Sequence, residues 1–458
     1  MSETSGPDIA VLSDALPAGL ADWVAEQRWY GAKTTVPRLE RIGGWSIDHG
    51  DVRISTHYIL DRGVDRATLY QVPLTERITP LPSLAPIGTA GGRYIYDAPH
   101  DPAYALAILG LILTEDEVGG ARGHRQPGTP PLVISDSAVL RGEQSNTSII
   151  CRVENGTPVI LKVFRALHNG DNPDVVLQSA IAAAGSLLVP TSVGFLSGQW
   201  PDSGRPDGIA RGHLAFAQEF LPGAEDAWRV ALLAARTGQD FAERARTLGE
   251  ATAAVHATLS EVLPTRLPTA ADIDSILAGM RARLNLALRE VPALEDCRSS
   301  IERLFELART APWPPLQRIH GDYHLGQVLD VPGRGWVIVD FEGEPLRSMT
   351  ERSELDVTLR DVAGMLRSFD YAAGSVAQTG GGTGPAESVE AWAPAARHAF
   401  IDGYIARSGV NLRLRREVVD AFEIDKALYE AVYEARNRPD WIAIPVEAVR
   451  RLAHCATP

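Results

Sequence analysis

The chain has 458 residues, of which 45% are hydrophobic and 22% are charged, and its formal net charge is −14. This size and composition predict a globular protein with more than one core. The negative charge argues against nucleic-acid binding, which needs clustered Lys and Arg. No apolar run reaches the roughly 18 residues of a membrane span, and the polar first residues do not form a secretory signal. We therefore expect a cytoplasmic protein that binds neither nucleic acid nor membrane.

The first residues predict a β-rich N-terminal module over 1–88. A helix is expected over 16–28, followed by short segments of alternating apolar residues and a proline-rich run that marks a boundary. An intermediate subdomain over 89–131 follows. It is predicted to contain a strand that runs into a helix over 94–113 and a Gly- and Pro-rich loop over 119–131.

Residues 132–224 predict a nucleotide-binding lobe made of strands. Asn155-Gly156 separates two β-branched runs and predicts a hairpin, because both residues tolerate positive φ. The next strand contains Lys162, one of only three lysines, amid apolar residues. A buried ammonium needs an anionic partner, and the phosphates of ATP would supply one. The alternative is an edge-strand lysine whose amine reaches solvent.

The loop before the second of these strands offers small polar side chains and backbone N–H groups to phosphates. It contains one glycine, so the signal is weak by itself. The candidate nucleotide-binding residues of this loop are Gln144, Ser145, Asn146 and Thr147.

The last segment, 225–458, is dominated by helical spacing and contains the strongest motif. Asp322 in His320-Gly321-Asp322 is followed by Gln327 and then by Asp340, after a predicted turn at 332–335 and a short strand. Phosphoryl transfer needs a carboxylate that takes the acceptor's proton and oxygen ligands for Mg²⁺. We predict that Asp322 is the base and that Gln327 and Asp340 hold the metal. The alternatives are a plain turn with a strand-end cap, or a zinc site at His320 and His324.

A polar and aromatic cluster near the C-terminus predicts a site for a sugar acceptor. Sugars present apolar C–H faces, which aromatic rings cover, and hydroxyls, which planar polar groups bind. We assign acceptor binding to Tyr433, Asn437, Arg438 and His324. The alternative is that Asn437-Arg438-Pro439 only ends a helix.

These motifs resemble the aminoglycoside, choline and related small-molecule kinases, which have an α+β, bilobal, protein-kinase-like fold. The His-Gly-Asp motif with Gln327 and the run Ile338-Val339-Asp340-Phe341-Glu342-Gly343 carry this resemblance. Further segments, spread over nearly the whole chain, resemble the actinobacterial maltokinases. They are 28–31, 142–147, 218–223, 340–345, 360–371 and 429–441.

The resemblance implies transfer of the γ-phosphate of ATP, with Mg²⁺, to the anomeric hydroxyl of maltose. The product would be maltose 1-phosphate, a donor for α-glucan and glycogen synthesis. The resemblance also implies that residues 1–88 cap the nucleotide lobe and that adenine meets a hinge at Gln218, Glu219 and Leu221. Trehalose synthase is a candidate partner, because similar kinases occur joined to it.

One departure from the kinase pattern concerns the partner of Lys162. Kinases pair this lysine with a Glu on the next helix, but no Glu lies between Ala166 and Gln218. Asp171, Asp174 or the nucleotide alone could take that place.

Two further functions stay open from the sequence. One is a kinase for another small hydroxyl acceptor, although the arginines of the C-terminal cluster disfavour a cationic one. The other is a non-catalytic scaffold subunit of a trehalose-converting enzyme, which the complete set of Asp322, Gln327 and Asp340 disfavours.

Overall fold

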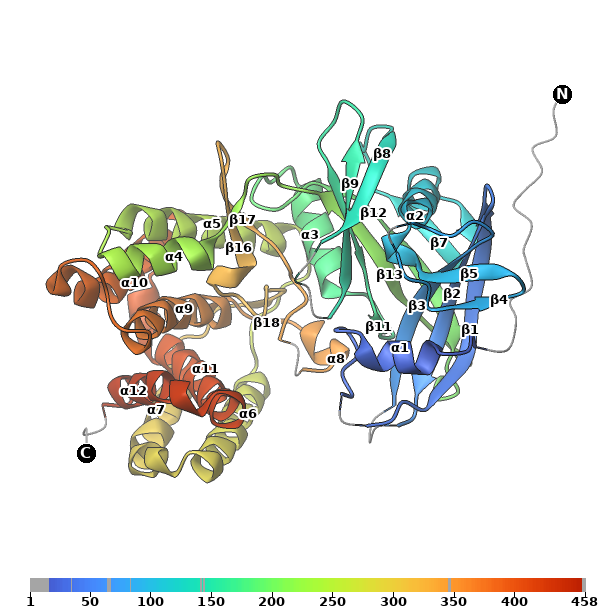
Figure 1. The fold of residues 1–458 in the computed structure, drawn as a ribbon. Coiled ribbons are helices and arrows are strands. Elements are labelled where there is room, and N and C mark those ends of the chain that lie inside the picture. The colour runs from blue at the N-terminus through green and yellow to red at the C-terminus, as the bar shows by residue number, and fades with distance from the viewer. Residues whose placement is uncertain are drawn as a thin grey trace. The chain divides into compact units, whose positions relative to one another are not determined.

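The computed structural model describes residues 16–33, 35–63, 67–82, 84–140, 142, 145–344 and 347–454. The chain divides into two compact units, Met1–Ser179 with Pro190–Pro222, and Ala180–Val189 with Gly223–Pro458. Figure 1 shows antiparallel sheets in the first unit and mainly helices in the second. None of the helices in the described ranges is long and apolar enough to cross a membrane.

The first sheet of unit 1 is built from hairpins and takes in strands on both sides of residue 88. Helix α1 (Leu20–Glu26) and the rings of Trp29 and Tyr30 are buried in one cluster with Ile59 and Tyr70 of this sheet. The strands pair in the order β1 (Leu39–His49), β2 (Val52–Asp61), β3 (Thr68–Arg77), β5 (Arg93–Asp97) and β4 (Gly88–Ala90), and β11 (Ala166–Leu167) also pairs with β3.

The second sheet of unit 1 contains the predicted nucleotide-lobe strands. Its hairpin turn lies at Asn155-Gly156 as predicted, with Asn155 at a φ of 55°. Helix α2 (Pro102–Thr114) packs on β7 and β12, after the turn η1 (Ala98–His100), and α3 (Pro173–Ala183) follows β11 in the chain. The strand order is β6 (Glu117–Val118), β7 (Ala121–Arg125), β12 (Ser192–Pro201), β13 (Ile209–Glu219), β10 (Val159–Val163), β9 (Thr147–Val153) and β8 (Ile134–Val139).

The prediction of a loop over 119–131 was wrong in part, because β7 lies inside it. The strand buries Ala121 and Gly123 and turns Arg122 outward. A Cβ at Gly123 would lie 1.9 Å from the Leu111 oxygen of α2, so the glycine permits close packing of helix on sheet. A glycine in the sequence usually indicates a loop, but Gly123 lies in a strand and is needed there because helix α2 packs against it.

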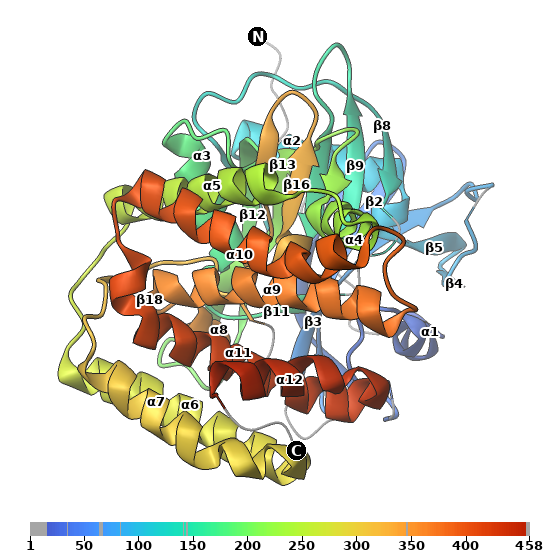
Figure 2. The ribbon, with the colours of Figure 1, turned by 90° about the vertical axis from the view of Figure 1, so that its left-hand side faces the viewer.

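Unit 2 consists of helices with short strand pairs between them. In Figure 2, α10, α9, α11 and α12 follow one another, and α6 lies beside α7. The helices are α4 (Ala227–Thr237), α5 (Ala242–Val262), α6 (Ala270–Glu290), α7 (Arg298–Thr310), α8 (Met349–Arg352), α9 (Thr358–Gln378), α10 (Ala386–Ser408), α11 (Arg416–Asn437) and α12 (Ala443–Leu452). The short 3₁₀-helices of this unit are η2 (Pro292–Cys297), η3 (Leu325–Gln327), η4 (Leu412–Arg415) and η5 (Pro439–Trp441).

Two small sheets lie among these helices. One has the order β14 (Glu225–Asp226), β16 (Val328–Val331) and β17 (Gly335–Ile338), and the other pairs β15 (Leu316–Gln317) with β18 (Asp356–Val357). The β16–β17 hairpin stands where the sequence predicts a turn between Gln327 and Asp340. Helix α5 packs very closely on α10, since a Cβ at Gly249 would lie 2.1 Å from the Phe400 oxygen.

Arg165 joins the two sheets of unit 1. It is fully buried and donates two hydrogen bonds to Asp97, of 2.8 and 2.9 Å, and a third of 2.9 Å to the Thr147 hydroxyl. Its guanidinium also lies 4.9 Å from the centre of the Trp29 ring. Trp29, Asp97 at the end of β5 and Thr147 at the start of β9 therefore contact one buried cation.

We predict that Arg165→Met destabilises unit 1 by about 3–5 kcal/mol, because it leaves Asp97 buried without its charge partner. The measurement is the free energy of unfolding in urea, followed by tryptophan fluorescence. Arg152→Met is the matched control, since Arg152 forms an exposed ion pair with Asp136 and should change stability little. Equal effects of the two substitutions would contradict the prediction.

Candidate active site

The loop that carries the His-Gly-Asp motif is held by Asp361 on α9. One oxygen of Asp361 accepts the His320 N–H at 2.8 Å, and the other accepts the Gly321 N–H at 2.9 Å. His256 of α5 donates a third hydrogen bond, of 3.0 Å, from Nε2. Burial raises the pKa of Asp361, but the hydrogen bond from His256 and nearby positive charge outweigh it, and the pKa lies below its ordinary value. The carboxylate is thus ionised and saturated with donors.

His320 braces this loop, and both of its ring nitrogens are engaged. Nε2 donates to the Val339 carbonyl at 3.0 Å, and Nδ1 accepts the Asp322 N–H at 3.4 Å. Nδ1 of His324 accepts the Gly326 N–H at 3.0 Å. This use of His320 in backbone hydrogen bonds argues against the zinc alternative.

The candidate base Asp322 faces a lysine that the sequence reasoning did not assign. Lys426 Nζ of α11 lies 3.1 Å from Asp322 Oδ1 and 3.7 Å from Glu344. Burial raises the pKa of Asp322, but the positive charge of Lys426 outweighs it, so the pKa lies below the usual aspartate value. Asp322 is therefore ionised at neutral pH, as a general base must be before it takes a proton.

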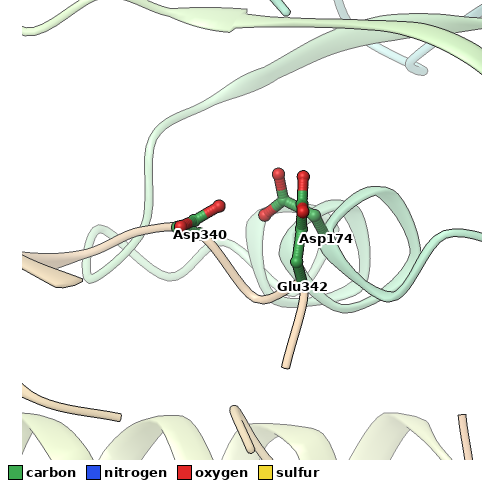
Figure 3. Close-up of side chains that lie close together, drawn as sticks. All are labelled: Asp174, Asp340 and Glu342. Carbon is green, nitrogen blue, oxygen red and sulfur yellow. The ribbon is translucent and has the colours of Figure 1, made fainter. Parts of the chain in front are cut away.

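The candidate metal ligands lie at one end of the β16–β17 hairpin. The Gln327 carbonyl accepts the Val339 N–H at 3.0 Å, which brings Gln327 beside the residue before Asp340. Asp340 has a φ of 65°, and one carboxylate oxygen of Asp340 lies within 4.8 Å of one from Glu342. Figure 3 shows these two side chains on the segment after β17 and Asp174 on α3. The oxygen donors of Asp340, Glu342 and the Gln327 amide fit a hard cation such as Mg²⁺.

The partner of Lys162 within unit 1 is Asp174. The distance from Lys162 Nζ to Asp174 Oδ2 is 3.1 Å, and both residues are buried. Strand β10 lies between β9 and β13, so the alternative of a lysine on an edge strand was wrong. Kinases pair the corresponding strand lysine with a Glu on the next helix, and in this chain Asp174 of α3 forms an ion pair with Lys162.

The other candidate nucleotide-binding residues that the structure describes belong to unit 1. Thr147 begins β9 and accepts the hydrogen bond from Arg165, and Ser145 and Asn146 precede it. Gln218 and Glu219 end β13, and Leu221 follows. Gln144 lies outside the described residues.

A pocket of about 400 Å³ in unit 2 lies next to Asp322, since Lys426 lines it. Its volume is in the range of small-molecule sites. Of the predicted acceptor-binding residues, His324, Tyr433 and Arg438 line it. Asn437 is not among its lining residues, and its amide donates to the Tyr433 carbonyl at 2.8 Å. Tyr429 and Glu434, which belong to the predicted C-terminal cluster, also line it. The lining residues that sequence reasoning left unassigned include Asp226, Trp228, Tyr371, Lys426 and Glu430.

The residues from α11 have a spacing that could have revealed them. Lys426, Tyr429, Glu430, Tyr433 and Glu434 follow the i, i+3, i+4, i+7, i+8 pattern of one helix face. When most of a helix is buried, polar and aromatic residues along one of its faces indicate that this face lines a cavity. We missed this signal because only the C-terminal end of the helix stood out.

The glutamates of the pocket are paired with arginines. Arg438 binds Glu434 at 2.6 and 3.0 Å, and Tyr371 also donates to Glu434. Arg367, which is fully buried, binds Oε2 of Glu430 at 2.6 and 3.1 Å. These acids therefore contribute little net negative charge to the pocket.

Comparison with known proteins agrees with this architecture. Residues 138–407 match the phosphotransferase enzyme family, and residues 23–101 match the maltokinase N-terminal cap domain. The first match covers more than half of the chain, which therefore belongs to the phosphotransferase enzyme family. Its fold is the predicted α+β, kinase-like fold with a β-rich N-terminal cap.

Curated relatives and solved structures include glucosamine kinases. The chain is 29% identical to that of Streptacidiphilus jiangxiensis over 73% of this chain and 83% of the relative. It is 27% identical to the glucosamine kinase of Mycolicibacterium smegmatis, over 72% of this chain and 84% of the relative. The structure of glucosamine kinase in complex with glucosamine, ADP and inorganic phosphate aligns with a TM-score of 0.69 at 21% identity, covering 95% of this chain and 100% of that one.

The Asp361 site generates a prediction about pH. The folded-state pKa of Asp361 lies below the unfolded value of about 3.9, so its contribution to stability is full above that value and is lost as pH falls through the folded pKa. Asp361→Asn should cost about 2–3 kcal/mol at pH 7, because the amide satisfies fewer of the three donors. The difference from wild type should shrink below about pH 4.

The measurement is the free energy of unfolding of both proteins in urea between pH 7 and pH 3.5. Asp274→Asn is the control, because Asp274 forms an exposed ion pair with Arg309, and it should change stability little. A difference between wild type and Asp361→Asn that is constant with pH would refute the ionised pairing.

Proposed function

We propose that this chain is an ATP- and Mg²⁺-dependent kinase that phosphorylates a hydroxyl of a small sugar. The observation that carries the proposal is the candidate base Asp322 next to a sugar-sized pocket, with Lys426 in contact with both. Membership of the phosphotransferase family supports the reaction type. The glucosamine kinase bound to glucosamine and ADP supports a sugar acceptor and an adenine nucleotide.

In the proposed reaction, the acceptor oxygen forms a bond to the γ-phosphorus of ATP. The bond from that phosphorus to the bridging oxygen breaks, and its electron pair leaves with ADP. The acceptor's proton passes to Asp322 and then to solvent. Lys162 would bind the ATP phosphates, and Gln327 and Asp340 would hold Mg²⁺. A bound Mg²⁺ would neutralise phosphate charge.

We further propose maltose as the acceptor, phosphorylated at its anomeric hydroxyl. The match of residues 23–101 to the maltokinase cap supports this, as does the pocket. Trp228, Tyr371, Tyr429 and Tyr433 offer aromatic faces, and Tyr371 lies parallel to Trp441, with their ring planes 5° apart. Pairing of the pocket glutamates with arginines favours a neutral sugar over a cationic one.

Glucosamine is the second candidate acceptor, because the curated relatives act on it by name and three carboxylates line the pocket. Glu430 and Glu434 are paired with arginines, whereas Asp226 caps α4 and accepts the Trp228 N–H at 2.7 Å. The division at residues 88, 131 and 224 is a proposal that rests on the sequence pattern, and a trehalose synthase partner is a proposal that rests on the sequence resemblance.

The acceptor is tested with ATP, Mg²⁺ and a panel of maltose, glucosamine, glucose and an aminoglycoside, with products identified by ³¹P NMR. We expect a sugar 1-phosphate from maltose and a kcat/KM for maltose at least about tenfold above that of any other acceptor, the effect of about 1.4 kcal/mol. Preference for glucosamine would overturn the maltose proposal and keep the sugar kinase. No turnover of any sugar would overturn both.

We predict that Asp322→Asn lowers kcat by about 10²–10⁴-fold, since an amide cannot take the acceptor's proton. The measurement is coupled ADP release at saturating ATP and acceptor. Binding of ATP and the melting temperature should stay near wild type. A variant that keeps more than about a tenth of the wild-type kcat would refute the base assignment.

A further inference from the structure

Lys426 lies at the centre of a charged cluster in unit 2. Its Nζ is 3.1 Å from Asp322 Oδ1, 3.7 Å from Glu344 Oε1 and 5.0 Å from the centre of the Tyr429 ring. Only 24% of the side chain is exposed, and 18% of that of Asp322. Ordering a partly buried lysine beside an aspartate is costly unless the pair is well matched, so the arrangement calls for a functional reason.

The contact constrains Asp322 to one orientation. Oδ1 is held by Lys426, whereas Oδ2 makes no hydrogen bond to any residue in the described part of the chain. A carboxylate with one anchored oxygen presents the other in a fixed direction. Oδ2 is therefore the oxygen open to a substrate hydroxyl.

The anchor also belongs to the wall of the acceptor pocket. Tyr429, Glu430, Tyr433 and Glu434 follow Lys426 on the same face of α11 and line the pocket. The position of α11 consequently sets both the wall and the base. A shift of this helix would move the pocket wall and Asp322 together. If Asp322 were held only by its own loop, the same shift would move the wall alone.

We propose that Lys426 is a positioning residue for phosphoryl transfer, which fixes Oδ1 of Asp322 so that Oδ2 takes the acceptor's proton. This inference rests on the proposed function. Proton transfer to Oδ2 accompanies formation of the bond from the acceptor oxygen to the γ-phosphorus, and ADP leaves with the electron pair of the broken bond. Lys426 keeps its own protons throughout.

The charge of Lys426 has a second effect, on the pH at which the base is available. Burial by itself raises the pKa of Asp322, and the ammonium lowers it. The pKa of Lys426 is itself raised, because its acidic neighbours outweigh its burial. Lys426 therefore remains charged wherever Asp322 titrates.

The charged or titratable groups around the pair are His320, His324, Glu344, Arg352, Tyr429 and Glu430, with Arg283, Arg360 and Asp425 lining the adjoining cavity.

The experiment compares the full-length wild type with Lys426→Met over the pH range of activity. We expect kcat to fall by about 10²-fold, the effect of a base displaced by about 1 Å, with a smaller change in KM for the acceptor. The acid limb of the kcat profile should move to higher pH, since Asp322 loses the charge that lowers its pKa. An unmoved acid limb, or a loss confined to KM, would overturn the inference.

Lys426→Arg separates charge from position. It should keep the acid limb near that of wild type but lower kcat, because a guanidinium cannot occupy the site of an ammonium without moving the carboxylate. It also serves if the methionine variant fails to fold. Lys33→Met is the matched control, since among the described residues Lys33 donates to the backbone carbonyls of Ala25 and Gln27 in unit 1, and it should leave kcat and the pH profile unchanged.

A readout without turnover separates this inference from the proposed function. Titration of the Asp322 carboxyl by ¹³C NMR should give a higher pKa in Lys426→Met than in wild type. An inactive wild type that still shows this difference would sink the kinase proposal and keep the electrostatic pairing. Equal titration of Asp322 in both proteins would overturn the inference, whatever the activity.

Discussion

The arrangement of unit 2 depends on one buried carboxylate, that of Asp361. Its two oxygens take hydrogen bonds from two consecutive backbone N–H groups and from His256, which come from different parts of the chain. An unpaired buried N–H is costly, so the loop has one low-energy geometry. That geometry points His320 at the Val339 carbonyl, and thereby ties the base to the hairpin that ends in Asp340.

The chain uses its two kinds of cation for different tasks. Arginines such as Arg165 and Arg367 are fully buried in ion pairs that join separate elements, where a planar group with several donors suits a carboxylate. The two lysines that lie in strand β10 and helix α11 face Asp174 and Asp322 instead. Lys426 contacts only Oδ1 of Asp322 among its two oxygens, whereas Arg165 contacts both oxygens of Asp97. The scarcity of lysine is therefore informative at both positions.

The sequence motifs located the loop and hairpin correctly but left most of the pocket unassigned. Asp322, Gln327 and Asp340 could be found because they lie within one short segment whose spacing reflects a local hairpin. Trp228, Tyr371 and Lys426 come from α4, α9 and α11, so only helix packing brings them together. The strand β7 was missed for a similar reason, because its glycine, Gly123, is required by close packing against helix α2.

The sequence by itself determined the fold class, the hairpin at Asn155-Gly156, the catalytic-type motif and the need of Lys162 for an anionic partner. These follow from local spacing, turn chemistry and the cost of burying an unpaired charge, all of which act between near neighbours. Only the tertiary structure decided that Asp174 meets Lys162 and that Lys426 meets Asp322. The second pair is separated by 104 residues, and such a contact depends on how helices pack.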